Sequence, residues 1–523
     1  MSIKITKFYF LFHLNLNTNK PHRTIIIMII GLDIGTSSTK AVAFDLEGQV
    51  LATHSISYPI LNPLEGYYEQ DPEVIYSACI DSVARVMNEL QDHDKMLQPM
   101  CISVSSVMHG LIAVDKLGKP LTNCIIWADR RSEEIAIELK ANEKGRLLYQ
   151  QTGTPIHPMS VLCKLIWMRS YDDKVLVRSH KFIGIKEFLF YRLFGIYVVD
   201  HSIASATGLF DIHQLAWSDL ALNLAGISSE QLSTPVSVDH VSRLLNIDIA
   251  AAMNIPKGTL FVIGGSDGCL SNLGVGAVKP GVASVTVGTS GAIRVTCPLP
   301  NPEQKQRLFS YLLRPNEYII GGAVNNGGIL RSWFRDTFLD ESIEKIQDKD
   351  ADVLLNEMVD SIDPGSEGLI FLPYLTGERA PYWNSNAKGV YFGIQLYHNK
   401  AHFARAMIEG MLFAIYSVGI ALEESTGPIH KIYASGGFAR SQNLVQMLAD
   451  IFNKPVFIKN TVESSAWGAA LIGMEALGIE FKELNIGADN AEHLYMPNGE
   501  NHAVYVRNFE QFQRLYQKLE DEF

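Results

Sequence analysis

Two short turns of the same composition carry residue types suited to phosphate binding. They are Gly35-Thr36-Ser37 and Gly288-Thr289-Ser290, each between two β-branched runs that read as strands. A glycine without a Cβ lets backbone N–H groups come close to an anion, and the neighbouring hydroxyls add further donors. One such turn is usually an ordinary hairpin, because glycine and serine favour turns for conformational reasons. Two of them indicate a duplicated domain that holds a nucleotide polyphosphate from both sides.

Asp267 is the candidate for proton transfer. It lies in the segment Gly-Gly-Ser-Asp-Gly at 264–268, after an apolar run and before a helical pattern. An aspartate at such a junction is often only a helix N-cap. Here the two preceding glycines leave the backbone near the carboxylate without side chains, and the second phosphate turn follows closely in the chain. A carboxylate beside a transferring phosphoryl group can accept the proton of an attacking hydroxyl, so we predict that Asp267 is a general base.

Asp33 lies on the strand that leads into the first turn. A buried carboxylate at this position is unfavourable unless it is paired or bound to a metal ion. Mg²⁺ keeps much of its hydration shell in proteins. We therefore expect Asp33 to hold Mg²⁺, through water, beside the phosphates.

Two further segments carry groups that suit a sugar. SSVMHGLIAVD at 105–115 presents Met108 and His109, and IIWADRRS at 125–132 presents Trp127, Asp129 and Arg130. Taken singly, each segment has an ordinary interpretation: the first would contain an interior histidine, and the second would be a helix N-terminus with solvated charges. Together they offer donors, acceptors and an apolar face, the usual lining of a sugar site. A third segment, SGGFARS at 435–441, has a double-glycine turn at Gly436 and Gly437 that a flat base could approach.

Composition and charge narrow the class of protein. The chain has 523 residues and a formal net charge of −12, which argues against nucleic acid as the main partner. Its six cysteines form no CxxC pair, so we expect reduced thiols in a cytoplasmic protein and no metal cage. No apolar run reaches 18 residues, and no membrane helix is expected. A homodimer is left open.

The elements that must position these residues follow an α/β pattern. We expect residues 1–27 to be a leader that is disordered or not native, with Met28 as the natural start. Strands and helices then alternate to about residue 260, with one long helix beginning at Asp71-Pro72-Glu73. A second half repeats the strand-turn-strand unit at 282–296 and is helix-rich from about 398 to 480.

From Met28 to Phe523 the chain resembles the FGGY family of carbohydrate kinases, within the actin-like ATPase superfamily. The segment GVYFGIQLYHNKAHFARAMIE at 389–409 fits the second signature of the family. MSVLCKLIW at 159–167 approximates the first signature, with Val161 where the family usually has Pro, Ser or Thr, and Ser170 also departs.

The resemblance implies an α/β fold of two actin-like (ribonuclease H-like) domains with a nucleotide cleft between them. Residues 28–265 would bind the sugar and residues 266–523 the nucleotide, with ATP and Mg²⁺ as cofactors. It also implies site roles, namely Asp267 as the base, Asp33 at the metal, the two turns at the phosphates, Gly436, Gly437 and Asn443 at the adenosine, and Met108, His109, Trp127 and Asp129 at the sugar.

Within the family, VMHGLIAVD, IIWADRRS and TGTPIHPMS followed by KLIW are most similar to gluconate kinases. This likeness implies ATP-dependent phosphorylation of the terminal hydroxyl of D-gluconate to 6-phosphogluconate. We expect Arg130 or Lys164 to pair with the substrate carboxylate. A xylulokinase or another pentulose or polyol kinase is the nearer alternative, since xylulokinases share the Met-His-Gly element. An actin-like ATP-binding protein without sugar chemistry is the remote one.

Overall fold

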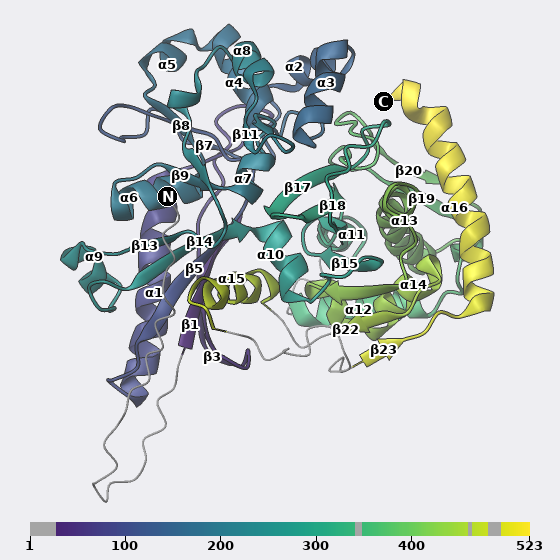
Figure 1. The fold of residues 1–523 in the computed structure, drawn as a ribbon. Coiled ribbons are helices and arrows are strands. Elements are labelled where there is room, and N and C mark those ends of the chain that lie inside the picture. The colour runs from purple at the N-terminus through teal and green to yellow at the C-terminus, as the bar shows by residue number, and fades with distance from the viewer. Residues whose placement is uncertain (1–27, 340–347, 459–462, 480–492) are drawn as a thin grey trace, which may run out of the picture.

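The computed structural model describes residues 28–339, 348–458, 463–479 and 493–523 (Figure 1). Two sheets, each with its own set of helices, form two lobes that follow one another along the chain. The predicted leader, residues 1–27, lies outside the described residues. All six cysteines are free thiols, and five of them are buried.

The first sheet has six strands in the order β13-β14-β5-β1-β2-β3. Strand β1 is antiparallel to β2 and parallel to β5, which in turn is parallel to β14. The hairpin between β1 and β2 carries the first predicted phosphate turn. The strand bounds are β1 Met28–Ile34, β2 Ser38–Asp45, β3 Val50–Ser57, β5 Pro99–Ser106, β13 Val241–Arg243 and β14 Leu260–Ser266.

The second sheet has seven strands in the order β17-β18-β16-β15-β21-β22-β23. Its strands β18-β16-β15-β21-β22 repeat the order and the directions of β3-β2-β1-β5-β14. This repeat confirms the prediction of two α/β domains of one type. The bounds are β15 Val282–Val287, β16 Gly291–Cys297, β17 Phe309–Arg314, β18 Glu317–Val324, β21 Lys431–Ser435, β22 Val456–Ile458 and β23 His493–Tyr495.

Helices cover the sheets, and two of the longest show why the sequence forms them. Helix α1, Pro72–His93, begins as predicted, because Asp71 accepts the Glu73 N–H and proline occupies the first position. Helix α13, Lys400–Thr426, lies against β16, β18 and β19. It is long and apolar enough to cross a membrane, but 83% of its most apolar stretch is buried, which is typical of a core helix.

The remaining larger helices are α2 Glu133–Lys140, α3 Glu143–Thr152, α4 Val161–Tyr171, α5 Asp173–Arg178, α6 Ile185–Phe194, α7 His201–Ser205, α8 Asp219–Ala225, α9 Ile247–Ala252, α11 Ile329–Phe338, α12 Asp348–Asp360, α14 Gln442–Phe452 and α16 Gly499–Leu519. Five short strand pairs complete the structure: β4 Glu69–Gln70 with β7 Cys124–Ile125, β6 Ile112–Val114 with β8 Lys181–Ile183, β9 Val198–Asp200 with β12 Thr234–Val236, β10 Phe210–Asp211 with β11 Ala216–Trp217, and β19 Ile370–Pro373 with β20 Gly389–Phe392.

Helices α10, Asp267–Gly274, and α15, Ser464–Ala476, join the two lobes. Although α15 comes late in the chain, it packs on β1 and β5 of the first sheet (Figure 1). The two helices touch through glycines, since a Cβ on Gly468 would lie 2.0 Å from the Leu270 carbonyl oxygen. A Cβ on Gly31 of β1 would likewise lie 2.2 Å from the Ala466 carbonyl oxygen. Only glycine permits backbones to approach so closely.

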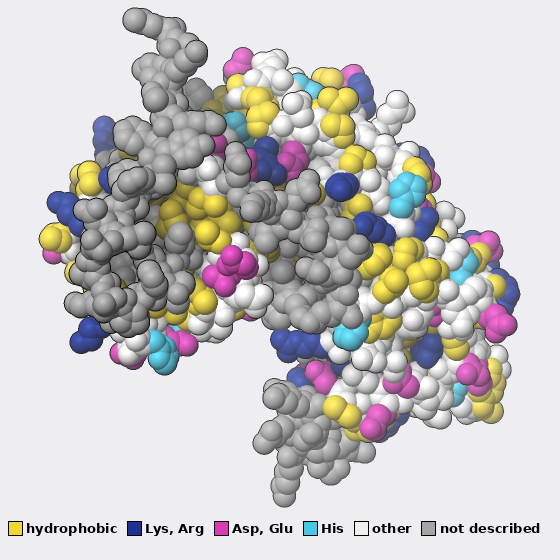
Figure 2. Space-filling view, turned by 60° about the horizontal axis from the view of Figure 1, so that its bottom comes forward, with side chains coloured by type: hydrophobic (Ala, Val, Ile, Leu, Met, Phe, Trp, Pro, Cys, Tyr) yellow, Lys and Arg dark blue, Asp and Glu magenta, His cyan; other side chains and the backbone are white. Residues whose placement is uncertain are grey.

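The surface carries charges of both signs. On the face shown in Figure 2, basic and acidic side chains are scattered among uncharged ones rather than gathered by sign.

Candidate active site

A cavity of about 160 Å³ brings together residues from both halves of the chain. Six of the residues singled out from the sequence line it: Thr36, Met108, His109, Trp127, Asp267 and Ser290. The second half adds Arg294, Tyr311, Arg379 and Trp383, which the sequence analysis did not name. A larger cavity of about 1070 Å³, beside Leu273 and Ile479, contains none of the predicted site residues.

An irregular end of strand β14 places Asp267 on this cavity. The register between β14 and β5 shifts between Val262 and Gly265. Gly264 has a φ of +63°, and a Cβ there would lie 2.1 Å from the Val104 carbonyl oxygen, so the bend requires glycine. Asp267 follows as the first residue of α10, where its Oδ1 accepts the Gly268 N–H at 2.6 Å. Burial raises the pKa of Asp267, which makes it a better proton acceptor when ionised.

A buried ion pair holds the backbone before Asp267. Lys186 donates to Asp200 Oδ2 at 2.6 Å and to the carbonyls of Ile263 and Gly265 at 3.1 and 2.9 Å. Asp200 also accepts from the Ser202 hydroxyl at 2.5 Å, and that hydroxyl accepts the N–H of Ser266 at 2.7 Å. The network therefore fixes both sides of the bend that carries Asp267.

Asp33 lies at the end of β1, next to β5. Its Oδ1 accepts a hydrogen bond from the Ser105 hydroxyl at 2.6 Å. Burial raises the pKa of Asp33 to about 6, the Ser105 hydrogen bond opposes this rise, and the negative charge of Asp267 adds to it. Asp33 and Asp267 are therefore close enough for their negative charges to repel each other, and a divalent cation would relieve that repulsion.

The first phosphate turn is held by side chains from the first domain. Tyr58 donates to the Gly35 carbonyl at 2.6 Å, and Gln70 donates to the Thr36 carbonyl at 2.6 Å. Trp127 Nε1 donates to Thr36 Oγ1 at 2.9 Å. Trp127 therefore links the phosphate turn to the wall of the cavity, while Ser37 in the same turn is exposed.

The second phosphate turn separates the cavity from a neighbouring pocket of about 490 Å³. Ser290 lines the cavity, whereas Gly288, Thr289 and Gly437 line the pocket. Gly436 has a φ of +90°, and a Cβ there would lie 2.5 Å from the Val287 carbonyl oxygen. The predicted adenosine turn thus packs directly behind the phosphate turn. Asn443 does not line the pocket, and its amide donates to Asp360.

The walls of the cavity carry polar atoms that lack partners. His109 Nδ1, Tyr311 Oη and two nitrogens of Arg294, Nε and Nη1, are buried without a hydrogen-bond partner among the described residues. Burial lowers the pKa of His109 to about 3, so its ring is neutral and offers one donor and one acceptor. Buried polar groups are nearly always hydrogen-bonded, so unpartnered polar atoms on three residues that line one cavity favour a polar ligand there.

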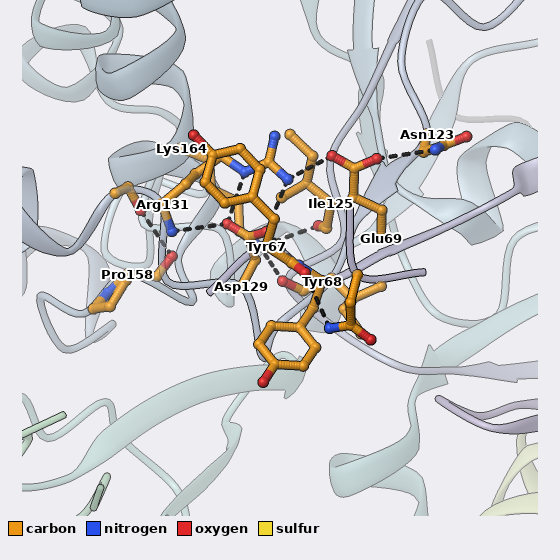
Figure 3. Close-up of polar contacts among 12 residues, drawn as sticks. Tyr67, Tyr68, Glu69, Asn123, Ile125, Asp129, Arg131, Pro158 and Lys164 are labelled. Atoms are coloured by element: carbon orange, nitrogen blue, oxygen red, sulfur yellow. Dashed lines mark hydrogen bonds and ion pairs between the residues drawn. The ribbon is translucent and has the colours of Figure 1, made fainter. Parts of the chain in front are cut away.

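Three residues predicted to meet the substrate lie elsewhere. Asp129 accepts the Tyr68 N–H at 2.7 Å and pairs with Arg131, which also contacts Glu69 (Figure 3). Arg130 pairs with Glu133 at 2.9 Å, on a surface groove that is separate from the cavity.

Lys164 is the third, and it is fully buried. It donates to the carbonyls of His109, Ile125 and Ile126, at 2.6, 3.2 and 2.9 Å. An ammonium group has three protons, and these bonds use all of them. The expectation that Lys164 or Arg130 pairs with a substrate carboxylate is therefore not supported by this geometry, because neither side chain faces the cavity.

Comparison with known proteins agrees with this arrangement. The models of the N-terminal and C-terminal domains of the FGGY family of carbohydrate kinases match residues 28–274 and 283–477. The chain belongs to the FGGY family of carbohydrate kinases. It is 43% identical to a gluconokinase from Bacillus licheniformis, over 95% of this chain and 96% of that protein.

Two solved structures from Lactobacillus acidophilus are also similar to the chain. One is titled a gluconate kinase, with a TM-score of 0.88 and 33% identity over 94% of this chain and 98% of that one. The other is titled a ligand-bound xylulose kinase, with a TM-score of 0.87 and 33% identity over the same shares. The family and its fold confirm the predictions of a two-domain actin-like sugar kinase that uses ATP.

Proposed function

We propose that the protein transfers the γ-phosphoryl group of ATP to the terminal hydroxyl of D-gluconate, giving 6-phosphogluconate. The observation that carries the proposal is the position of Asp267 on a cavity that the second phosphate turn separates from a larger pocket. A sugar hydroxyl in the cavity and a nucleotide in the pocket would meet at Ser290 and Thr289. The 43% identity to a gluconokinase over nearly the whole chain supports gluconate as the sugar.

The transfer needs a base and a fixed line of attack. Asp267 accepts the proton of the terminal hydroxyl while the hydroxyl oxygen bonds to the γ-phosphorus. The bond between that phosphorus and the oxygen bridging to the β-phosphate breaks, and ADP leaves with the electron pair. The backbone N–H groups of the two turns hold the phosphates, and His109 and Trp127 orient the sugar. We assign sugar binding mainly to residues 28–265 and nucleotide binding to residues 266–523.

We further propose that Asp33 holds Mg²⁺, through water, beside the ATP phosphates. The raised pKa of Asp33, to which the neighbouring negative charge contributes, supports this assignment. Oxygen donors of this kind suit Mg²⁺, which is usually bound through one or two carboxylates, water and substrate phosphates. The ion would neutralise charge on the phosphates. We also propose that the enzyme is cytoplasmic, and its six free cysteines support this location.

A xylulokinase is the alternative that a specific observation favours, since a solved relative titled a xylulose kinase is as similar in structure as the gluconate kinase. A coupled ADP-release assay on gluconate, xylulose, ribulose, glycerol and glucose distinguishes the two. We expect gluconate to have the highest kcat/KM, and a phosphorus-coupled NMR signal at C6 to identify the product. A clear preference for xylulose would refute the gluconate proposal while leaving the kinase fold intact.

A further inference from the structure

The cavity that holds Asp267 has an excess of positive charge. Of the residues that line it, three are charged at neutral pH: Asp267, Arg294 and Arg379. His109 adds no charge, because burial lowers its pKa to about 3. The wall therefore carries two guanidinium groups against one carboxylate. A neutral sugar would leave one cation uncompensated, whereas a sugar with a single negative charge would balance it.

Arg294 is the less satisfied of the two cations. It lies on β16, and its guanidinium is beside Gly268, where a Cβ would approach Nε at 3.1 Å. Its Nε and Nη1 are buried and have no hydrogen-bond partner in the part of the chain that the structure describes. A guanidinium offers five N–H donors in a planar fork that matches a carboxylate. Arg294 also lines the cavity, so its guanidinium lies beside the space that a substrate would fill.

Arg379 lies on the same cavity and is held in place by its surroundings. Its side chain is buried, donates from Nε to Asn325 Oδ1 at 2.7 Å, and lies 4.7 Å from the ring centre of Trp127. Two positive groups that share a wall repel each other, and a carboxylate bound between them removes that repulsion. Arg379 therefore provides a fixed second contact beside the unpaired Arg294.

We propose that Arg294, with Arg379 beside it, binds the carboxylate of the substrate and so selects sugar acids over neutral sugars of the same length. This inference rests on the proposed function and names the residues that determine its substrate class. Neither guanidinium lines the pocket assigned to the nucleotide, so the charge they supply is directed to the sugar site. They replace Arg130 and Lys164, which are engaged elsewhere.

The test compares D-gluconate with D-gluconamide, which has the same hydroxyls and length but no charge. Binding is measured by titration calorimetry without ATP, so the result does not depend on turnover. We expect the unmodified protein to bind gluconate roughly 30-fold more tightly or better, because a buried charge pair of this kind commonly contributes that much. In Arg294→Gln the ratio should fall to within about threefold, and Arg379→Gln should lower it in the same direction.

Two controls accompany the test. Arg243→Gln removes a guanidinium from an exposed strand residue that donates to the Gly258 carbonyl, and it should keep the full ratio. Arg294→Lys retains the charge without the fork, so it should keep part of the ratio, and it serves if Arg294→Gln does not fold. Circular dichroism checks folding in each case.

The outcomes distinguish an error in the assignment of Arg294 from an error in the proposed function. If Arg294→Gln keeps the preference for gluconate, or weakens both ligands equally, the assignment of Arg294 is wrong and the gluconate kinase proposal stands. If the unmodified protein binds xylulose but neither gluconate nor gluconamide, the proposed function is wrong. Loss of the ratio in Arg294→Gln, with gluconamide binding changed less than threefold, supports the inference.

Discussion

The buried pair of Lys186 and Asp200 leads to a prediction in which stability and catalysis change together. Replacing Lys186 by methionine keeps a side chain of similar length but removes three hydrogen bonds, one to Asp200 and two to backbone carbonyls on either side of Gly264. Asp200 is fully buried, so it would remain as a charge without its counterion.

The structure indicates the size of both effects. Removing one partner of a buried ion pair typically lowers the free energy of unfolding by about 3 to 5 kcal/mol. Asp200 keeps the Ser202 hydroxyl and two backbone N–H groups as donors, so we expect the low end, about 3 kcal/mol. The carbonyls of Ile263 and Gly265 would lose their anchor, and Asp267 lies two residues beyond. A displacement of about 1 Å in a catalytic group can lower the rate roughly 100-fold.

Denaturant unfolding measures the first effect, and kcat from a coupled ADP-release assay, at a temperature where the variant is folded, measures the second. Lys181→Met is the matched control, because Lys181 also donates to two backbone carbonyls but lies away from Asp267. If Lys186→Met unfolds more easily yet keeps kcat within about twofold, the pair stabilises the domain and does not position Asp267.

Three further predictions follow from the same geometry. Asp267→Asn should lower kcat by roughly 100-fold or more while ATP binding, measured by calorimetry, changes only a few-fold; near-normal turnover would contradict the assignment of the base. His109 has a pKa of about 3 in the folded protein and about 6.5 in the unfolded chain, so the unfolded chain takes up a proton first as the pH falls, and the folded state loses stability. His109→Gln should therefore remove about 1.3 kcal/mol of the stability loss between pH 7 and pH 5.5. Denaturant unfolding at both pH values measures the difference. Gly468→Ala should lower the free energy of unfolding by about 1 to 3 kcal/mol, because its Cβ would lie 2.0 Å from the Leu270 carbonyl oxygen. Gly499→Ala is the control, since a Cβ there would have nothing within 4 Å. Equal midpoints of thermal unfolding for the two variants would show that the contact between α10 and α15 does not require glycine.

Features encoded over a few neighbouring residues could be predicted from the sequence. The two turns, the strand-to-helix junction at Asp267 and the helix start at Asp71 each depend on local conformational preferences. All are present in the structure. The duplicated sheets could be inferred because the same local unit occurs twice.

Features that depend on the packing of distant segments could not be predicted from the sequence. Arg294 and Arg379 reach the cavity only because the second domain closes against the first, and neither belongs to a turn motif. An arginine within the mostly buried strand GAIRVTC was the available signal. The position of Asp129 away from the cavity has a related reason, since the sequence does not reveal that its neighbour Arg131 pairs with it. Lys164 is occupied by carbonyls from two other segments.

The late position of helix α15 in the chain bears on how the protein is made. Its apolar residues form one cluster with Ile29, Val42 and Phe44 of the first sheet, so among the described residues that face of the sheet lacks much of its cover until residue 476 has been synthesised. While the ribosome adds the second half, a nascent chain of the first half would present an open hydrophobic surface. A fragment that ends at the predicted boundary, residue 265, would carry the same surface permanently. Such a fragment is therefore expected to aggregate or to bind chaperones unless a peptide covering α15 is supplied in trans.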